Sequence, residues 1–181
     1  MIFKNIFDNN ISGNVVQFGR GSYSGIWSVI LSKISNNLTI VDYSLPMIKV
    51  IKKTLKLNKI PMKNITIVNE KMENYNENLK NADHIIFSYS MSFSNINETM
   101  KNITDNSKIG CKINIAETLK PIIHNMRTDL NSKQKKYNTK WKNNLLKIEK
   151  SFNKKLSWKL LKKEIKGNGI PSLVLYYIKI K

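Results

Sequence analysis

Short apolar runs alternate with helical patterns over the first 120 residues of the chain. The apolar runs are almost continuous, which is typical of parallel strands that are buried on both faces. They lie at 14–18, 38–41, 65–68, 84–88 and 112–116. The helical patterns between them lie at 25–35, 46–57 and 97–104. This alternation predicts a parallel sheet covered by helices on both faces.

Two of these helices carry further local signals. The helix over 25–35 has one apolar face, formed by Ile26, Trp27, Ile30, Leu31 and Ile34. The helix over 46–57 is expected to begin with Pro46, which suits a first helical position, and Ser44 is a candidate N-cap. Asn58 is expected to end it.

The last part of the chain has a different pattern. Two strand-like runs, 156–165 and 172–180, flank Gly167-Asn168-Gly169, which predicts an antiparallel hairpin. The predicted fold class is therefore α/β, a doubly wound, Rossmann-like parallel sheet with a C-terminal antiparallel hairpin at the sheet edge. No Gly/Ser-rich or Pro-rich linker and no internal repeat interrupts the chain, so a single domain is expected over 1–181.

Positive charge is concentrated after residue 110. The chain has 31 Lys and Arg and 12 Asp and Glu, a net charge of +19. Residues 1–110 carry 13 basic and 8 acidic side chains (net +5), whereas residues 111–181 carry 18 and 4 (net +14). Only Arg20 and Arg127 are arginines, although arginine binds phosphates better than lysine does. Lysine, asparagine and isoleucine are also the residues of A/T-rich codons. Two interpretations therefore stay open, a solvated lysine coat and a surface for an anionic partner.

A basic amphipathic helix is predicted over 133–155. Its apolar face is formed by Tyr137, Trp141, Leu145, Ile148 and Phe152, at spacings of 4, 4, 3 and 4. Lysines occupy much of the remaining surface, which suits an anionic membrane. Packing against the core with a solvated lysine face is one alternative, and binding of nucleic acid through the same lysines is another.

Several classes of protein are excluded by what the chain lacks. The chain contains no run of about 18 apolar residues, so no transmembrane helix is expected. The segment Met1–Asn5 opens neither a secretory signal nor an Arg-rich transit peptide. The single cysteine, Cys111, excludes an intrachain disulfide and an all-cysteine zinc site, and no metal is expected. We therefore expect a cytoplasmic protein that is peripheral on a membrane if the basic helix binds lipid. The oligomeric state is left open.

The carboxyl ends of the strands are where a doubly wound sheet binds its ligands. The first strand is followed by Gly19-Arg20-Gly21-Ser22-Tyr23-Ser24-Gly25, where glycines allow a sharp turn and a helix N-terminus offers free N–H groups. Asp42 ends the second strand, and a carboxylate at that place accepts hydrogen bonds from the hydroxyls of a ribose. The alternative role for Asp42 is that of an acid at the start of the next helix.

The third and fourth strands are also followed by candidate residues. Glu70-Lys71-Met72 follows the third strand, where residues of this architecture flank an adenine ring. The alternative is that these three residues form an ordinary polar loop. Phe87-Ser88-Tyr89-Ser90-Met91 offers hydroxyls and an aromatic face to a substrate, with core and turn residues as the alternative. Of the two histidines, His84 lies within a strand and suits a structural role, whereas His124 is a candidate base.

These motifs resemble the class I S-adenosylmethionine-dependent methyltransferases. The Gly-x-Gly-x-x-x-Gly loop is one residue longer than the dinucleotide fingerprint. The resemblance covers the cofactor-binding part, about 12–117, and the closing hairpin matches the last two strands of the family; the basic helix and this hairpin lie over about 127–181. The segment from Ala82 to Met91 is similar to the Phe-Ser-Tyr-Ser segment of bacterial lipid N-methyltransferases, which trimethylate diacylglyceryl-homoserine to betaine lipids. The final strand, from Ile170-Pro171 through Tyr176-Tyr177, resembles that group as well.

The resemblance implies an S-adenosylmethionine-dependent enzyme that N-methylates a small-molecule or lipid amine. It implies a catalytic role for Ser88, Tyr89 and Ser90. Their hydroxyl dipoles and the aromatic face would stabilise the methyl transfer, whose rate depends mainly on positioning of the two reactants. The residues that it implies for cofactor binding are Gln17, Gly19, Arg20, Gly21, Tyr23, Asp42, Tyr43, Met47, Lys71, Met72, Phe87 and Ser88.

Two positions depart from the family pattern. Gln17 stands where most of these enzymes carry an acid, and Lys71 stands where many carry an aspartate that reads adenine. A cofactor-binding fold without methyl transfer is therefore one alternative. A tRNA or rRNA methyltransferase that uses the basic C-terminal portion is another, although the Asn/Asp-Pro-Pro-Tyr motif of amino-methylating nucleic-acid enzymes is absent after the fourth strand.

Overall fold

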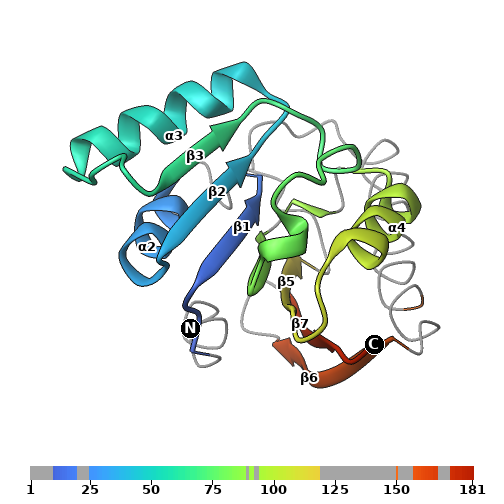
Figure 1. Cartoon of the computed structure of the whole chain (residues 1–181). Coiled ribbons are helices and arrows are strands. Elements are labelled where there is room, and N and C mark those ends of the chain that lie inside the picture. The colour runs from blue at the N-terminus through green and yellow to red at the C-terminus, as the bar shows by residue number, and fades with distance from the viewer. Residues whose placement is uncertain are drawn as a thin grey trace, which may run out of the picture.

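A seven-stranded sheet with helices on both faces forms the body of the molecule in the computed structural model (Figure 1). The structure describes residues 10–19, 25–88, 90–91, 94–118, 150, 157–166 and 172–181. The strands are β1 (Asn14–Phe18), β2 (Asn37–Val41), β3 (Ile65–Val68), β4 (His84–Ser88), β5 (Lys112–Thr118), β6 (Trp158–Lys166) and β7 (Ser172–Lys179). The helices are α2 (Ile26–Ile34), α3 (Leu45–Leu57) and α4 (Ile96–Asn106), with a short 3-10 helix, η1 (Leu79–Asn81).

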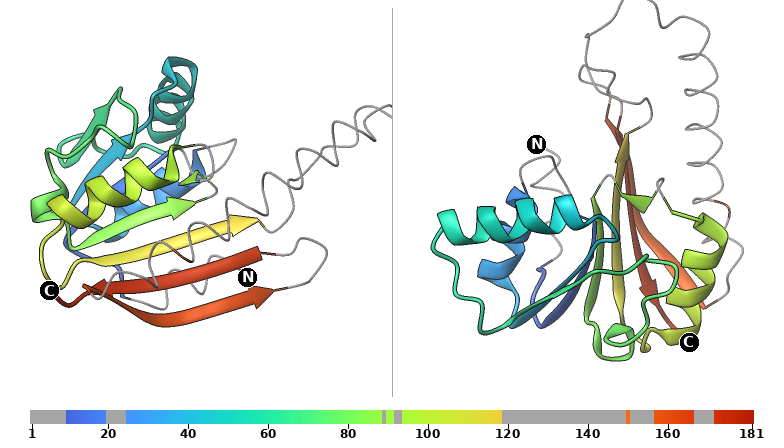
Figure 2. Two further views of the ribbon diagram at one scale, coloured as in Figure 1. Left: turned by 90° about the vertical axis from the view of Figure 1, so that its right-hand side faces the viewer. Right: turned by 90° about the horizontal axis from the view of Figure 1, so that it is seen from above.

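The strand order is β3-β2-β1-β4-β5-β7-β6. Parallel pairs join β1 to β2 and β4, β2 to β3, and β4 to β5. By contrast, β7 runs antiparallel to both β5 and β6, and Figure 2 shows this pair along one edge of the sheet. The predicted doubly wound sheet with an antiparallel hairpin at its edge is thereby confirmed.

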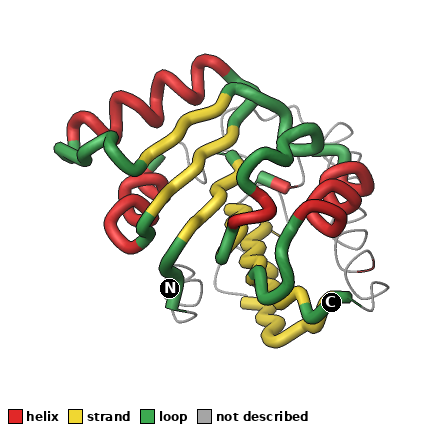
Figure 3. Tube along the Cα trace, viewed as in Figure 1, coloured by secondary structure: helices red, strands yellow, loops and turns green. Residues whose placement is uncertain are grey.

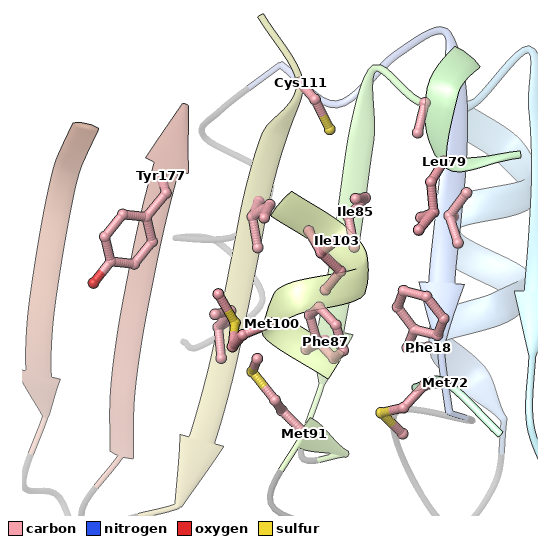
Figure 4. Packing of buried hydrophobic residues seen from close by; sticks show 14 of the residues in the cluster. Phe18, Met72, Leu79, Ile85, Phe87, Met91, Met100, Ile103, Cys111 and Tyr177 are labelled. Carbon is pink, nitrogen blue, oxygen red and sulfur yellow. The ribbon is translucent and has the colours of Figure 1, made fainter. Parts of the chain in front are cut away.

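Successive residues of each strand face opposite helical layers, because side chains alternate along a strand. One core cluster joins the sheet to α2 and α3, and its members include Trp27, Leu31, Leu38, Ile40, Ile51, Leu55 and Ile86. The other joins the sheet to α4 and the β3–β4 connection, and includes Tyr75. Figure 4 shows other members of this cluster, among them Phe18, Met72, Ile85, Phe87, Met100 and Ile103. The tube view shows the strands between these two helical layers (Figure 3).

The boundaries of α3 follow the predicted start and stop signals. Ser44 is the N-cap and Asn58 the C-cap, as predicted, and the helix begins at Leu45, one residue before Pro46. The amide of Asn58 also donates from Nδ2 to the carbonyl of Thr54, at 2.8 Å. The sequence therefore contains enough local information to place this helix to within one residue.

The buried face of α2 differs from the predicted one. Trp27 and Leu31 are buried as predicted, but Ser28 and Val29 are buried too, and Ile34 is 37% exposed. The helix packs against α3 as well as against the sheet, so that residues outside the predicted face are also covered. Ile34 is the last residue of the helix and extends beyond that packing. The short helix η1 was not predicted either.

Two predicted features lie outside the described residues. These are the helix over 133–155, apart from Lys150, and the turn at Gly167-Asn168-Gly169. Within the part of the chain that is described, no helix is both long and apolar enough to cross a membrane.

Candidate functional site

The carboxyl ends of β1, β2, β3 and β4 meet at one edge of the sheet, because these strands are parallel. Backbone hydrogen bonds continue past the strand ends there. The N–H of Gly19 donates to the carbonyl of Val41 at 2.8 Å, and the N–H of Asp42 donates to the carbonyl of Val68 at 3.1 Å. The first glycine of the predicted loop and the predicted ribose acid are therefore fixed next to each other.

Gly19 makes a turn that no other residue could make without strain. Its φ is +72°, in the left-handed region, and a Cβ added to it would lie 2.6 Å from the Cβ of Ser90. Ser90 is buried, and its hydroxyl donates to the carbonyl of Phe18 at 2.7 Å. Ser90, predicted to be catalytic, thus ties the end of β4 to the turn after β1.

Gln17 is fully buried one residue before the end of β1. Its Nε2 donates to the carbonyl of Gly19 at 2.8 Å, so the side-chain amide stabilises the glycine turn. A carboxylate at this position could not make that bond, since it has no hydrogen to donate. Within the described part of the chain, the Oε1 of Gln17 has no hydrogen-bond partner. A buried acceptor without a partner is costly unless a ligand satisfies it.

Asp42 is buried directly after β2. One of its carboxylate oxygens, Oδ1, accepts a hydrogen bond from the N–H of Ser44 at 2.8 Å, which orders the start of α3. Its backbone carbonyl accepts from Nδ2 of Asn69 at 3.0 Å. A carboxylate has about four acceptor positions, so a role at the helix start is compatible with binding of two ligand hydroxyls. The two roles that the sequence suggested for Asp42 are therefore not exclusive.

Tyr43 and Met47 lie beside Asp42 at the beginning of α3. Tyr43 is exposed and Met47 is half-buried. Their contact with a cofactor stays a prediction.

The two predicted residues after β3 have different environments. Lys71 is exposed, and its backbone carbonyl accepts from the N–H groups of Asn74 and Tyr75, at 3.1 and 3.2 Å. Met72 is buried in the core cluster that contains Phe18. The loop is therefore a tight turn with one side chain in the core and one in solvent, and no described carboxylate forms an ion pair with Lys71.

Three aromatic rings lie beneath the strand ends. Phe87 of β4 stacks on Phe18 of β1 with ring centroids 4.9 Å apart, and Tyr75 meets Phe18 edge-on at 6.1 Å. Phe87 is fully buried, and Ser88, which follows it, is buried on the opposite face of the sheet. The ring contacts pack the ends of β1 and β4 against each other and against the loop after β3. Contact of Phe87 with a cofactor stays a prediction.

Four of the predicted site residues lie outside the described residues. They are Arg20, Gly21, Tyr23 and Tyr89. Their expected roles stay predictions, as does that of His124.

Two buried groups can be assigned their protonation states. Burial, together with the charge of Lys112, lowers the pKa of His84 to about 4, so the imidazole is neutral at physiological pH. Burial raises the pKa of the Cys111 thiol to about 12, so it is not a thiolate at neutral pH. His84 therefore has the structural character that its place in a strand predicted, and Cys111 is not a candidate nucleophile.

Asn69 and Tyr75 were not identified from the sequence. Asn69 anchors the carbonyl of Asp42, and Tyr75 is held by Nδ2 of Asn78 at its hydroxyl (2.9 Å) and by Nδ2 of Asn102 at its carbonyl (2.6 Å). Burial raises the pKa of the Tyr75 hydroxyl. Tyr75 lies in a polar stretch between Glu73 and Glu77, so no periodic pattern marks it as a core residue.

The described residues contain no group of three or more histidine, cysteine or acidic side chains placed to hold a metal ion.

Comparisons with known proteins give fold similarity without sequence similarity. No protein-family model and no curated protein sequence matches the chain. An rRNA methylase from Streptococcus thermophilus superposes with a TM-score of 0.65 at 12% identity, over 99% of this chain and 95% of that one. The N-methyltransferase NodS from Bradyrhizobium japonicum, in complex with S-adenosyl-L-homocysteine, gives 0.68 at 9% identity, over 99% and 84%. A putative O-methyltransferase from Klebsiella pneumoniae gives 0.68 at 10% identity, over 98% and 79%. The chain therefore has the Rossmann-like fold that these methyltransferases share.

Proposed function

We propose that the chain is an S-adenosylmethionine-dependent methyltransferase. The observation that carries the proposal is the junction at the strand ends, where the turn at Gly19 and the carboxylate of Asp42 lie on neighbouring strands of a methyltransferase-like sheet. In one of the similar structures, the protein binds S-adenosyl-L-homocysteine, the demethylated form of that cofactor.

The residues at this junction fit such a cofactor on two observations. Gly19 makes a left-handed turn without a side chain at the strand ends, a type of turn that allows the backbone to come close to a ligand. The Oε1 of Gln17 is a buried acceptor that lacks a partner among the described residues, and it can accept a hydrogen bond from an ammonium group. Asp42 would bind the ribose hydroxyls, with Tyr43 and Met47 beside the nucleoside. Arg20, Gly21, Tyr23, Lys71, Met72 and Phe87 stay proposed as further cofactor contacts.

When bound, the cofactor would supply an electrophilic methyl group on a sulfonium. The chain's own contribution is positioning, which supplies most of the rate in a transfer that needs little acid–base chemistry. Ser90 holds the Gly19 turn through the carbonyl of Phe18, so we assign it a positioning role. Ser88 and Tyr89 would orient the acceptor amine after β4.

The acceptor we propose is a small-molecule or lipid amine. The Phe-Ser-Tyr-Ser segment over 87–90, which resembles that of bacterial betaine-lipid N-methyltransferases, supports a lipid head group. The predicted basic helix over 133–155 supports a location at an anionic membrane surface.

RNA is the second candidate acceptor. The net charge of +14 after residue 110 favours it, since phosphate contacts use the same lysines, and one of the similar structures is described as an rRNA methylase. A cofactor-binding protein without methyl transfer is the third candidate, supported by the departures at Gln17 and Lys71.

A transfer assay with methyl-labelled S-adenosylmethionine separates the three. The purified chain is incubated with diacylglyceryl-homoserine in vesicles, with free amines, and with tRNA and rRNA. We expect label in the lipid or the amines. Label in RNA alone would show that RNA, and not a lipid or small-molecule amine, is the acceptor. Cofactor binding without label in any acceptor class would favour the non-catalytic candidate.

The substitution Tyr89→Phe tests the proposed role of the residue after β4. We expect turnover to fall about tenfold while cofactor affinity changes less than twofold, because the hydroxyl would act on the acceptor. Steady-state rates and calorimetric titration measure the two quantities. An equal loss of both would place Tyr89 in the cofactor site instead.

A further inference from the structure

Six lysines form an unbroken basic strip along α3 and the connection to β3. The lysine strip consists of Lys49, Lys52, Lys53, Lys56, Lys59 and Lys63, all of which are exposed. No acidic residue occurs between Asp42 and Glu70, so the strip has a local charge of +6. None of the six forms an ion pair among the described residues, where the ion pairs are Lys101 with Asp105 and Lys108 with Asp83.

The helix directs these lysines to one side. Ile48, Ile51 and Leu55 are buried against the sheet. At 100° per residue, the four lysines within α3 fall in a sector of about 100° beside this buried face. The opposite flank, which includes Thr54, lies close to Gly25 at the start of α2. These angles therefore put the strip on the side of α3 away from α2. Helix α3 itself lies at the outer margin of the molecule, beside the edge strand β3 (Figure 1).

Lys59 occupies a position that favours glycine. Its φ is +53°, in the left-handed region, and it closes α3 through two hydrogen bonds, from its own N–H to the carbonyl of Lys56 and from the N–H of Ile60 to the carbonyl of Leu55. This pattern ends many helices, and glycine usually provides the left-handed residue. A lysine here makes the turn less stable than glycine would, and it extends the strip beyond the end of the helix.

Exposed apolar side chains lie at both ends of the strip. Leu45 is 58% exposed in the first turn of α3, on the same side as the lysines, and Leu57 is 71% exposed in the last turn. Tyr43 and Met62, just outside the helix, are exposed as well. Large aliphatic groups next to a row of cations gain nothing from contact with RNA phosphates, but they can enter the boundary between head groups and acyl chains.

We propose that the lysine strip, with Leu45 and Leu57, binds the surface of an anionic lipid bilayer. Each lysine near such a surface contributes attraction that decays within a Debye length, and the leucines add apolar burial. Because α3 starts at Leu45, three residues after Asp42, a chain bound through this surface has the edge of its candidate site close to the lipid. Binding through the strip requires neither a cofactor nor a methyl acceptor.

Vesicle co-sedimentation of the full chain tests the proposal. The variant Lys49→Gln/Lys52→Gln/Lys53→Gln/Lys56→Gln is compared with the control Lys80→Gln/Lys101→Gln/Lys159→Gln/Lys181→Gln, which removes the same charge from exposed lysines on other elements. On vesicles of mixed phosphatidylcholine and phosphatidylserine, we expect the strip variant to lose at least about tenfold in partitioning and the control to lose less than about threefold. Equal losses would overturn the proposal, since net charge alone would then explain binding.

Two single substitutions separate binding through the strip from loss of folding and from the effect of net charge. Lys59→Gly is expected to raise the midpoint of thermal unfolding by about 2–4 °C and yet weaken vesicle binding about threefold, a combination that loss of folding cannot produce. Leu57→Ser is expected to weaken vesicle binding by about threefold or more without changing the net charge. Unchanged vesicle binding in both variants would contradict the proposal.

Retention of a short RNA by the same variants decides between the two anionic partners. We expect the strip variant and its control to lose RNA affinity to the same extent. A loss of RNA binding that is specific to the strip variant, with vesicle binding intact, would overturn the membrane assignment in favour of nucleic acid.

Discussion

Gly19, Gln17 and Ser90 together determine the shape of the candidate site. Gly19 adopts φ +72° against the Cβ of Ser90, which leaves no space for a side chain. Gln17 donates to the carbonyl of Gly19 from one side of the sheet, and Ser90 donates to the carbonyl of Phe18 next to it. The turn is thus held by two side-chain donors as well as by the backbone. This explains why an amide suits position 17 in this chain, where the resembled family carries an acid.

The substitution Gln17→Glu tests this explanation. A buried carboxylate facing the carbonyl of Gly19 would replace a hydrogen bond with repulsion, and we expect the free energy of unfolding at neutral pH to fall by about 2–4 kcal/mol. Gln17→Met, which removes the donor without adding charge, is the matched control and should lose about 1 kcal/mol. Denaturant unfolding measures both, and a Glu variant as stable as the original chain would refute the role of the amide.

The sequence reveals the candidate residues at this scale but not their contacts. Asp42 and Gly19 could be identified because each follows an apolar strand, and strand ends are where such a sheet binds ligands. The hydrogen bond from Gln17 to Gly19 and the one from Asn69 to Asp42 could not, because both depend on side-chain rotamers in the folded chain. Tyr75 was missed because it is a core residue within a polar loop.

The end of α4 depends on a lysine from a distant element. Lys179 of β7 is buried, and its Nζ donates to the carbonyl of Thr104 at 2.6 Å and also to the carbonyl of Ser107. The cation lies at the C-terminal end of the helix, where carbonyls lack partners and the helix dipole favours positive charge. The antiparallel hairpin and the helical layer are thereby joined.

We expect Lys179→Met to lower the free energy of unfolding by about 2 kcal/mol, because two buried carbonyls lose a charged donor. Lys181→Met, two residues further on and exposed, is the control and should change stability by less than about 0.5 kcal/mol. Denaturant midpoints give both values. Equal stability of the two variants would show that Lys179 does not anchor the helix.

Elements were predicted well where local pattern and tertiary environment agree. The central strands β1, β2 and β4 were found because a strand buried on both faces requires a continuous apolar run. The edge strand β3 is only partly buried but has the same apolar pattern, and the hairpin was found from two strand-like runs that flank Gly167-Asn168-Gly169. The buried face of α2 was predicted only in part: Ser28 and Val29 are buried as well, and α2 packs against α3, a tertiary contact that the periodicity of a single helix does not reveal. The 3-10 helix η1, only three residues long, is too short to produce a period.

At the scale of the whole molecule, charge is distributed in two regions. The strong excess after residue 110 was evident from the sequence. The lysine strip on α3 became evident only from the fold, because the strip depends on which flank of the helix the sheet and α2 leave uncovered. Both regions are lysine-rich, which fits attraction to a surface better than bidentate recognition of single phosphates.

The stability of the whole molecule should depend on pH through His84. The ordinary pKa of histidine, 6.5, is lowered in the folded chain to about 4, first by burial and then by Lys112. The unfolded chain therefore binds a proton before the folded chain does. Stability from this group is fully present above pH 6.5 and is lost as the pH falls from 6.5 to 4. The loss amounts to about 3 kcal/mol.

Denaturant unfolding of the original chain and of His84→Asn between pH 7 and pH 4 measures this contribution. We expect the variant to lose less stability than the original chain over this interval, because an amide does not titrate. Asp83, whose pKa is lowered by its hydrogen bonds to Lys108 and Asn14, should act in both chains at still lower pH. Parallel pH profiles for the two chains would contradict the assignment.

Calorimetric titration of S-adenosylmethionine and S-adenosyl-L-homocysteine into the full chain and into Asp42→Ala tests the proposed function most directly. Asp105→Ala, an exposed acid on α4, is the control. We predict saturable binding of both ligands to the original chain and to the control, and at least about tenfold weaker binding to Asp42→Ala, because two hydroxyls lose a charged acceptor. Absence of binding to the original chain, or equal affinity of all three chains, would contradict the site.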